Sequence, residues 1–173
     1  MTQTSVYTKL ADFGKELLSK TSVIEGLPHI SKYVKDVIGA DRCSIFIYDT
    51  VKKELWTTLA DGVERIIVPS DKGVVGETIK LRKAIIVNDA YANPLFMSEI
   101  DKKTGYTTKN IITAPIFNSK KEVFGVLELL NKKDDFLDAD VKYMTFFTQY
   151  ISGFLELVKT YDEIDESHKK GKK

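Results

Sequence analysis

One acidic residue, Glu128, lies within an otherwise apolar run of the chain, Val123–Leu130. In a strand, alternation places Glu128 on the same face as Phe124, Val126 and Leu130. A carboxylate on an apolar face is unfavourable unless a partner satisfies it. Either Glu128 bonds a covering loop for structural reasons, or it points into a pocket and accepts hydrogen bonds from the N–H groups of a ligand.

A long polar segment, 88–109, is a second source of binding chemistry. It contains Asp101, Thr104, Thr107 and Thr108, which supply a carboxylate and hydroxyls. Segments of this length in compact domains are usually lids or binding loops. The alternative is that these side chains only cap a local helix and turn.

Two glycines, Gly73 and Gly76, open a short helix that is expected to run from the segment 70–77 to about Leu81. Glycines permit close backbone approach, and a helix N-terminus offers free N–H groups to an anion. Two glycines do not make a phosphate loop, however, so simple turn and packing roles are the alternative.

Composition argues against several classes of function. The 173 residues include 26 Lys+Arg and 25 Asp+Glu, a formal net charge of +1, with 43% hydrophobic and 29% charged residues. This balance gives no electrostatic reason to expect nucleic acid or a membrane surface as a partner. No apolar run approaches the ~20 residues that span a bilayer, and the N-terminus lacks a signal-peptide pattern, so we expect a cytoplasmic chain. The basic tail, 168–173, is expected to be solvated and disordered.

Cysteine and histidine usage speaks against catalysis. Cys43 is the single cysteine, and His29 and His168 are the only histidines. A lone cysteine excludes an internal disulfide and a Cys-rich metal site. Because the two histidines stand in unrelated contexts and no nucleophile–base pair is readable, we expect neither a metal site nor an enzyme.

Apolar periodicity predicts the elements that position these residues. Strands in the middle and helices at both ends indicate an α+β domain with an antiparallel sheet. We expect a single domain over 1–173, with its core at about 22–158, an N-terminal helix at 1–20, and a helix extension with the basic tail at 159–173. Helices are expected over 5–20, 23–38, about 70–81 and 138–166, and strands over 43–48, 54–60, 65–68, 84–87, 111–117 and 123–130.

The terminal helices carry apolar stripes at helical spacing. Their members include Val6, Leu10, Phe13 and Leu17, then Ile24, Leu27, Ile30, Val34 and Val37 or Ile38, and finally Met144, Phe147, Ile151, Phe154, Val158, Tyr161 and Ile164. Thr21 or Ser22 is expected to cap the second helix. The last helix would reach roughly 40 Å, longer than one sheet face requires, so we expect it to protrude toward a partner helix.

The chain from about Gly39 to Phe154 resembles a GAF domain. The resemblance rests on the segments CSIFIYD, DKGVVGETI, NDAYANPLF, DKKTGYTTKNI and VFGVLELLNKKDDFLDAD. These segments are most similar to the cyclic-nucleotide-binding GAF domains of phosphodiesterases and certain adenylyl cyclases. The resemblance implies an antiparallel sheet of about six strands, with the terminal helices on one face and a loop-covered pocket on the other.

A family signature is present in its structural part. Asn131, Lys132, Phe136 and Asp140 match it, and Val141 replaces its final glutamate. By resemblance, Lys132 and Asp140 form an ion pair behind the pocket and do not contact the ligand.

The resemblance also implies a set of ligand-binding residues. Matched by position, they are Ser44, Asp61, Val74, Val75, Met97, Asp101, Thr104, Thr108 and Glu128. The departures from the family are Ala60 in place of an aromatic residue, Met97 where a tyrosine can stand, and Val75 in place of an alanine. Loss of a stacking aromatic would weaken binding by roughly one or two orders of magnitude.

Two regulatory functions follow as hypotheses. The first is a sensor of cyclic AMP or cyclic GMP that needs no other cofactor. In this sensor Glu128 and Asp61 read the base, the amides at Val74 and Val75 hold the cyclic phosphate, and Thr104 and Thr108 close the loop. The signal would pass through the terminal helices to an output domain or signalling partner.

The second regulatory hypothesis is a homodimerisation or interaction module without a ligand. Two other chemistries of this fold are disfavoured. Methionine sulfoxide reduction needs an intramolecular disulfide, which one cysteine cannot form. Covalent bilin attachment needs a cysteine by a pocket, whereas Cys43 is expected inside a strand.

Overall fold

A six-stranded antiparallel sheet in the order β3-β2-β1-β6-β5-β4 forms the centre of the molecule. The computed structural model describes residues 3–19, 23–62 and 65–170, with the side chains of 3–4, 17–19, 23–25 and 157–170 left undescribed. The strands are β1 (Ala40–Asp49), β2 (Glu54–Ala60), β3 (Ile67–Pro69), β4 (Ile85–Val87), β5 (Ile111–Phe117) and β6 (Val123–Lys132).

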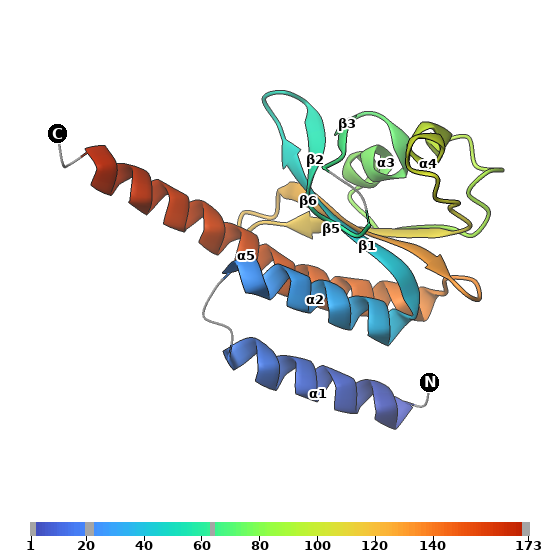
Figure 1. The fold of residues 1–173 in the computed structure, drawn as a ribbon, viewed down its shortest axis with the longest axis horizontal. Coiled ribbons are helices and arrows are strands. Elements are labelled where there is room, and N and C mark those ends of the chain that lie inside the picture. The colour runs from blue at the N-terminus through green and yellow to red at the C-terminus, as the bar shows by residue number, and fades with distance from the viewer. Residues whose placement is uncertain (1–2, 20–22, 63–64, 171–173) are drawn as a thin grey trace.

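Helices cover both faces of this sheet (Figure 1). One face carries α2 (Val23–Ile38) and α5 (Asp138–Lys170), and α1 (Gln3–Ser19) lies outside α2. The opposite face carries α3 (Gly73–Leu81), α4 (Ser98–Thr104) and the long connection that includes α4. The α+β class, the six strands and the placement of the terminal helices predicted from the sequence are confirmed.

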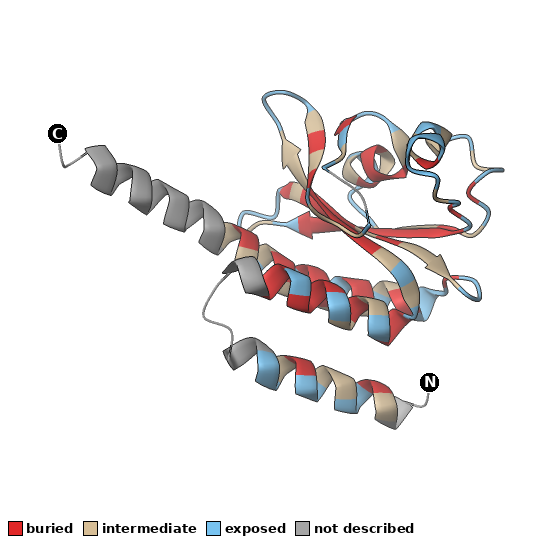
Figure 2. Ribbon diagram, viewed as in Figure 1, coloured by how far each residue is buried: buried red, intermediate tan, exposed pale blue. Residues whose placement is uncertain are grey.

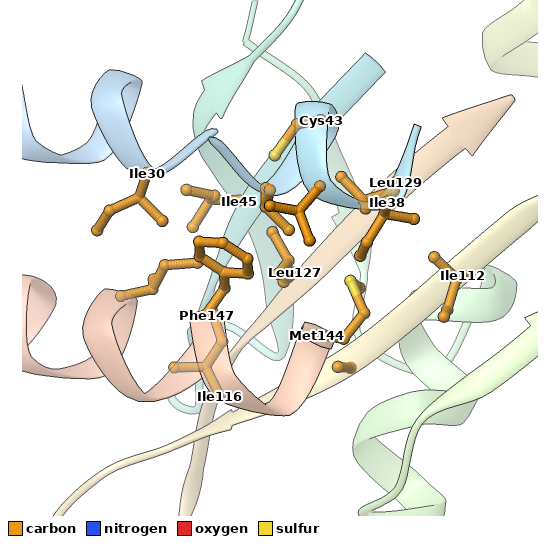
Figure 3. Close-up of a cluster of buried hydrophobic side chains, with 14 of the residues drawn as sticks. Ile30, Ile38, Cys43, Ile45, Ile112, Ile116, Leu127, Leu129, Met144 and Phe147 are labelled. Carbon is orange, nitrogen blue, oxygen red and sulfur yellow. The ribbon is translucent and has the colours of Figure 1, made fainter. Parts of the chain in front are cut away.

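The main core lies between the sheet and the pair α2 and α5. Ile45, Leu127 and Leu129 point from the central strands toward Met144 and Phe147 of α5, and all five side chains are fully buried (Figure 3). Buried residues line the inner sides of both helices and run along the central strands (Figure 2). Close packing on this face follows from the apolar periodicity of the helices and the alternation of the strands.

The helix α1 is held by aromatic contacts. The ring of Phe13 lies 5.2 Å from that of Phe147 and 5.4 Å from that of Tyr33, centroid to centroid. Val6 and Phe13 are buried, in agreement with the predicted stripe. The side chains of Leu17, Ile24, Val158, Tyr161 and Ile164, and the proposed caps Thr21 and Ser22, lie outside the described residues.

Several element boundaries differ from prediction: β1 begins at Ala40 and β6 ends at Lys132, so both strands are longer than expected. The strand predicted over 65–68 is Ile67–Pro69. At Ile66 the amide donates to the Thr57 hydroxyl (2.8 Å), while the carbonyl accepts the Thr57 amide (3.0 Å). The segment 88–109 contains a two-turn helix, α4, in agreement with the local helix that the sequence allowed there. The last helix continues to Lys170, so the expectation of disorder is wrong for residues 168–170. The division of the chain into core and extensions stays a prediction.

Candidate functional site

A cavity lies on the face of the sheet opposite α2 and α5. Its empty space is about 720 Å³ when the solvent at the open mouth is included. The structure places all nine residues predicted to bind a ligand on its walls: Ser44, Asp61, Val74, Val75, Met97, Asp101, Thr104, Thr108 and Glu128. Their role in binding stays a prediction.

Strand register creates a polar row across the face of the sheet that carries this cavity. Ser44 of β1 stands opposite Glu128 of β6, which stands opposite Thr113 of β5. Cross-strand partners share a face, so the three side chains project to the same side. Ser44 and Glu128 reach the cavity, whereas the Thr113 hydroxyl is buried beneath α3 and bonded to the hydroxyl of Thr78 at 2.6 Å.

Apolar residues flank the polar row. Phe46 pairs with Val126 on one side of it. Val126 and Leu130 share the face of Glu128, as predicted, whereas Phe124 packs against the helix-side core. The departure of Phe124 falls where the β5–β6 register shifts, between Ile116 and Phe117.

The carboxylate of Glu128 forms no hydrogen bond or ion pair with any described residue. Burial, with a smaller contribution from the charge of Asp101, raises the pKa of Glu128 from 4.5 to about 7. A covering loop therefore does not satisfy this group. Near neutral pH it is present both as a carboxylate, which only accepts, and as an acid, which also donates.

Asp61, by contrast, is already engaged. Its Oδ2 accepts the amide N–H of Cys43 at 3.0 Å and lies 2.6 Å from Nζ of Lys35, on α2. Both contacts use the same oxygen. Asp61 thus lines the cavity while it is anchored to β1 and to the helical layer.

Asp101 holds together the covering segment 88–109, called the lid below. Its Oδ1 accepts the hydroxyl of Thr108, and its Oδ2 accepts the amide of Thr108 and the hydroxyl of Tyr91, at 2.7, 2.7 and 2.8 Å. Thr104 donates to the carbonyl of Ile100. Asp101, Thr104 and Thr108 therefore bond to other groups of the lid, as expected if they cap a local helix and turn.

The helix α3 begins at the cavity wall. Lys72 provides no side-chain cap, and Gly73, Val74 and Val75 line the cavity. Gly73 has φ +73°, and a Cβ there would lie 3.1 Å from the Met97 sulfur. A Cβ on Gly76 would lie 2.8 Å from the Ser70 carbonyl oxygen, so close packing requires this glycine.

Sequence reasoning missed several cavity residues, among them Arg42, Phe46, Phe96 and Tyr106. The Arg42 guanidinium lies 3.7 Å from the centre of the Tyr106 ring, whose hydroxyl donates to Asp41 at 2.7 Å. Alternation from Ser44 along the strand would have placed Arg42 and Phe46 on the cavity face. Phe96 and Tyr106 reach the cavity from the lid, so aromatic surface is present although position 60 is alanine.

The signature residues stand behind the cavity. Lys132 Nζ lies 2.8 Å from Asp140 Oδ2, which also accepts the amide of Leu137. The side-chain amide of Asn131 accepts from the amide of Lys109 and donates to the carbonyl of Thr107, which fastens the end of the lid.

Phe136, the remaining signature residue, is 2% exposed. Its backbone pairs with the side chain of Asn88 at the start of the lid. The segment from Asn131 to Asp140 therefore pins the lid at both ends, and its side chains are absent from the cavity walls described above.

The described residues lack two features that would point to other functions. No cluster of three or more His, Cys, Asp or Glu side chains is arranged to hold a metal ion within residues 3–19, 23–62 and 65–170. Over the same ranges, none of the helices is both long enough and apolar enough to cross a membrane.

The GAF domain family model matches residues 22–154 of this chain. The fold and the lid-covered cavity are those of a regulatory domain that senses small molecules, as GAF domains do. The chain belongs to the GAF domain family.

Among curated proteins, the chain is similar to the probable 3',5'-cyclic phosphodiesterase pde-5 of Caenorhabditis elegans. The two are 28% identical over 156 residues, which cover 82% of this chain and 21% of that protein. The chain thus spans about a fifth of the length of this relative.

Solved structures share the fold at low identity. The GAF domain of a phosphoenolpyruvate-protein phosphotransferase from Coxiella burnetii superposes with a TM-score of 0.80 at 16% identity, covering 91% of this chain and 96% of that one. The free methionine-R-sulfoxide reductase from Neisseria meningitidis, in complex with its substrate, has a TM-score of 0.75 at 18% identity, covering 90% and 91%.

Proposed function

We propose that this domain is a sensor whose cavity binds a cyclic nucleotide, cyclic AMP or cyclic GMP. The observation that carries the proposal is the Glu128 carboxylate, which lines the open-mouthed cavity, is only partly exposed, and has no partner among the described residues. An unpaired acid that has lost most of its contact with water destabilises the protein, so its presence on a cavity wall indicates a ligand with N–H donors. The similarity to a probable cyclic-nucleotide phosphodiesterase supports the same class of ligand.

The two protonation states of Glu128 suit different bases. Ionised, the carboxylate accepts from two donors, which matches the N1–H and N2–H edge of guanine. Protonated, it donates once and accepts once, which matches N1 and the N6–H of adenine. Because the pKa of Glu128 is raised to about 7, the preference for cyclic GMP over cyclic AMP should increase as pH rises from 6 to 8.

The rest of the cavity fits the other parts of such a ligand. The first-turn amides of α3 at Val74 and Val75 suit the cyclic phosphate. Phe96 and Tyr106 offer apolar surface for the base or ribose. In this proposal Glu128 reads the base, Asp61 accepts from a ligand donor although it also holds Lys35, and Asp101 shapes the wall by holding the lid.

Calorimetric titration of the purified domain with each cyclic nucleotide tests the proposal. We expect saturable binding that Glu128→Gln shifts toward cyclic AMP by about tenfold, because glutamine fixes one donor and one acceptor. Glu99→Gln, an exposed acid on α4, is the matched control and should leave both affinities unchanged. The absence of heat with either nucleotide at millimolar concentration would overturn the proposal.

The signal would leave through the terminal helices, in this proposal as part of a homodimer attached to an output domain or signalling partner. Support comes from α5, which runs to Lys170 although its last buried described side chain is Leu155. Sedimentation equilibrium is the test, and a monomer at high concentration would exclude self-association.

Thiol-based reduction has no support at Cys43. The residue is 0% exposed and faces the helix-side core, away from the cavity. Burial raises the pKa of its thiol to about 12, whereas the reactive form of cysteine is the thiolate. The fold shared with a sulfoxide reductase is therefore not evidence that this domain reduces methionine sulfoxide.

A further inference from the structure

One cavity residue is tied directly to the helical layer. Asp61 lines the cavity, and its Oδ2 lies 2.6 Å from Nζ of Lys35 in the last full turn of α2. Among the ion pairs between described side chains, this is the one that joins a cavity wall to a helix of the opposite face. The side chains of Lys35 and Asp61 are 28% and 30% exposed, so the pair contributes little to stability.

A second residue of α2, one turn earlier, acts on the same part of the sheet. Ser31 lies four residues before Lys35, on the same side of the helix, and its side chain lies near enough to the Cys43 thiol to oppose the rise in that thiol's pKa. The amide of Cys43 donates to Asp61 Oδ2, and the amide of Asp61 donates to the Cys43 carbonyl. Lys35 thus holds Asp61, which is joined to Cys43 by two hydrogen bonds, and Ser31 lies beside the Cys43 thiol.

This group sits where the two faces of the sheet meet. Cys43 points toward the helices, and the next residue, Ser44, belongs to the polar row and lines the cavity. A displacement of this part of β1 or of Asp61 therefore acts on the cavity and on α2 together.

We propose that the Lys35–Asp61 ion pair couples the cavity to α2, with Lys35 as a positioning residue for the Asp61 carboxylate. The ligand-dependent part of this inference rests on the proposed function. Asp61 Oδ2 already accepts two donors, so a ligand donor at this carboxylate competes with Lys35 and loosens the end of α2. By linkage, release of Asp61 from Lys35 changes ligand affinity to the same extent.

The first test needs no ligand. Amide hydrogen exchange is followed over residues 31–38 in the intact chain and in Asp61→Asn, with Asp71→Asn, an exposed acid, as the control. We expect Asp61→Asn to accelerate exchange at the end of α2 by about fivefold or more, and Asp71→Asn to leave it unchanged. Equal exchange in both variants would overturn the coupling, whether or not a nucleotide binds.

The second test adds ligand. Cyclic GMP and cyclic AMP are titrated into the intact chain, Lys35→Met, Lys35→Arg and the control Lys32→Met, an exposed lysine one turn earlier on α2. Lys35→Met should change the dissociation constant by about fivefold or more and abolish the ligand-induced change in exchange over 31–38. Lys35→Arg, which keeps the charge, should restore both.

The two proposals fail in different ways. If neither nucleotide binds the intact chain, the proposed function fails and the ligand-free exchange experiment alone decides the coupling. If nucleotide binds but Lys35→Met behaves as Lys32→Met, the coupling is wrong and the proposed function stands.

Discussion

The two faces of the central sheet differ in packing: one is a close-packed apolar core, and the other holds a cavity. On the helix side, β6 presents Leu127 and Leu129, both fully buried against α2 and α5. On the other side, the same strand presents Glu128 and Leu130 to a cavity, while Val126 is buried against Phe46. One strand thus contributes one residue set to a packed core and the alternate set to a hollow that contains an unpaired acid.

This difference separates stability from function. A packed apolar face gains free energy from burial and dispersion, whereas an empty cavity and an unpartnered carboxylate both lose it. Truncation of a core side chain is therefore expected to destabilise the fold, whereas removal of the Glu128 charge is expected to stabilise it. Of the four predictions below, the first and third test that contrast, and the second and fourth test the bonds that hold the lid over the cavity.

The largest effect is expected on the helix side. Phe147→Ala removes a fully buried ring that contacts Phe13 and Phe146, and should lower the free energy of unfolding by about 3–5 kcal/mol. Urea denaturation followed by circular dichroism measures it. Lys142→Ala, exposed on the same helix, should stay within about 0.5 kcal/mol of the unmodified chain; similar losses in both would refute the contrast.

The lid should be next. Asp101→Ala leaves the amide and hydroxyl of Thr108 without their acceptor, and we expect a loss of about 2–4 kcal/mol together with faster exchange of the Thr108 amide. The same change removes a charge that raises the pKa of Glu128, so that pKa should fall. Asp135→Ala, at an exposed acid, is the control. If amide exchange in the lid is unchanged in Asp101→Ala, the hydrogen bonds of Asp101 do not stabilise the lid.

Glu128→Gln should stabilise the protein at alkaline pH. Because the folded-state pKa of Glu128 is raised from 4.5 to about 7, its ionisation destabilises the folded state progressively across that window. The penalty is absent below pH 4.5 and constant above about 7, where it is on the order of 2–3 kcal/mol. Glutamine removes the charge, so the variant should be more stable than the unmodified chain at pH 8 but not at pH 4.

Urea denaturation across this pH range measures the Glu128 effect, with Glu99→Gln as the exposed control. A variant that is equally stable or less stable at pH 8 would mean that the carboxylate is satisfied in solution. The Glu128 carboxylate would then not destabilise the folded state.

The smallest effect is expected at the mouth of the cavity. Tyr106→Phe keeps the ring under Arg42 but loses the hydroxyl that donates to Asp41, which should remove about 0.5–1.5 kcal/mol and loosen the lid. Limited proteolysis of the lid reports the change, with Tyr48→Phe as the control. Unaltered cleavage would mean that the Tyr106–Asp41 hydrogen bond does not hold the lid closed.

Local patterns predicted much of this molecule. The hairpin around 118–122 and the terminal helices follow from periodicity, and the short turn from Asn118, whose side chain accepts the amides of Lys120 and Glu122. All nine residues that the family resemblance implied lie on the cavity walls, although the sequence did not point to Arg42, Phe46, Phe96 or Tyr106. The bounds of β3 were missed, because a side-chain hydrogen bond such as that from the Ile66 amide to Thr57 leaves little trace in hydrophobic periodicity.

The sequence by itself determined the alternation over residues 126–130 of β6, which places Glu128 on one face of the sheet and Leu127 and Leu129 on the other. The tertiary structure alone decided what meets each group: Lys35 at Asp61, Thr108 at Asp101, and no described partner at Glu128. The reason is physical. Periodicity is set by bonds between near neighbours in the chain, whereas Asp61 and Lys35, like the three strands of the polar row, are brought together only by the register and closure of the whole sheet.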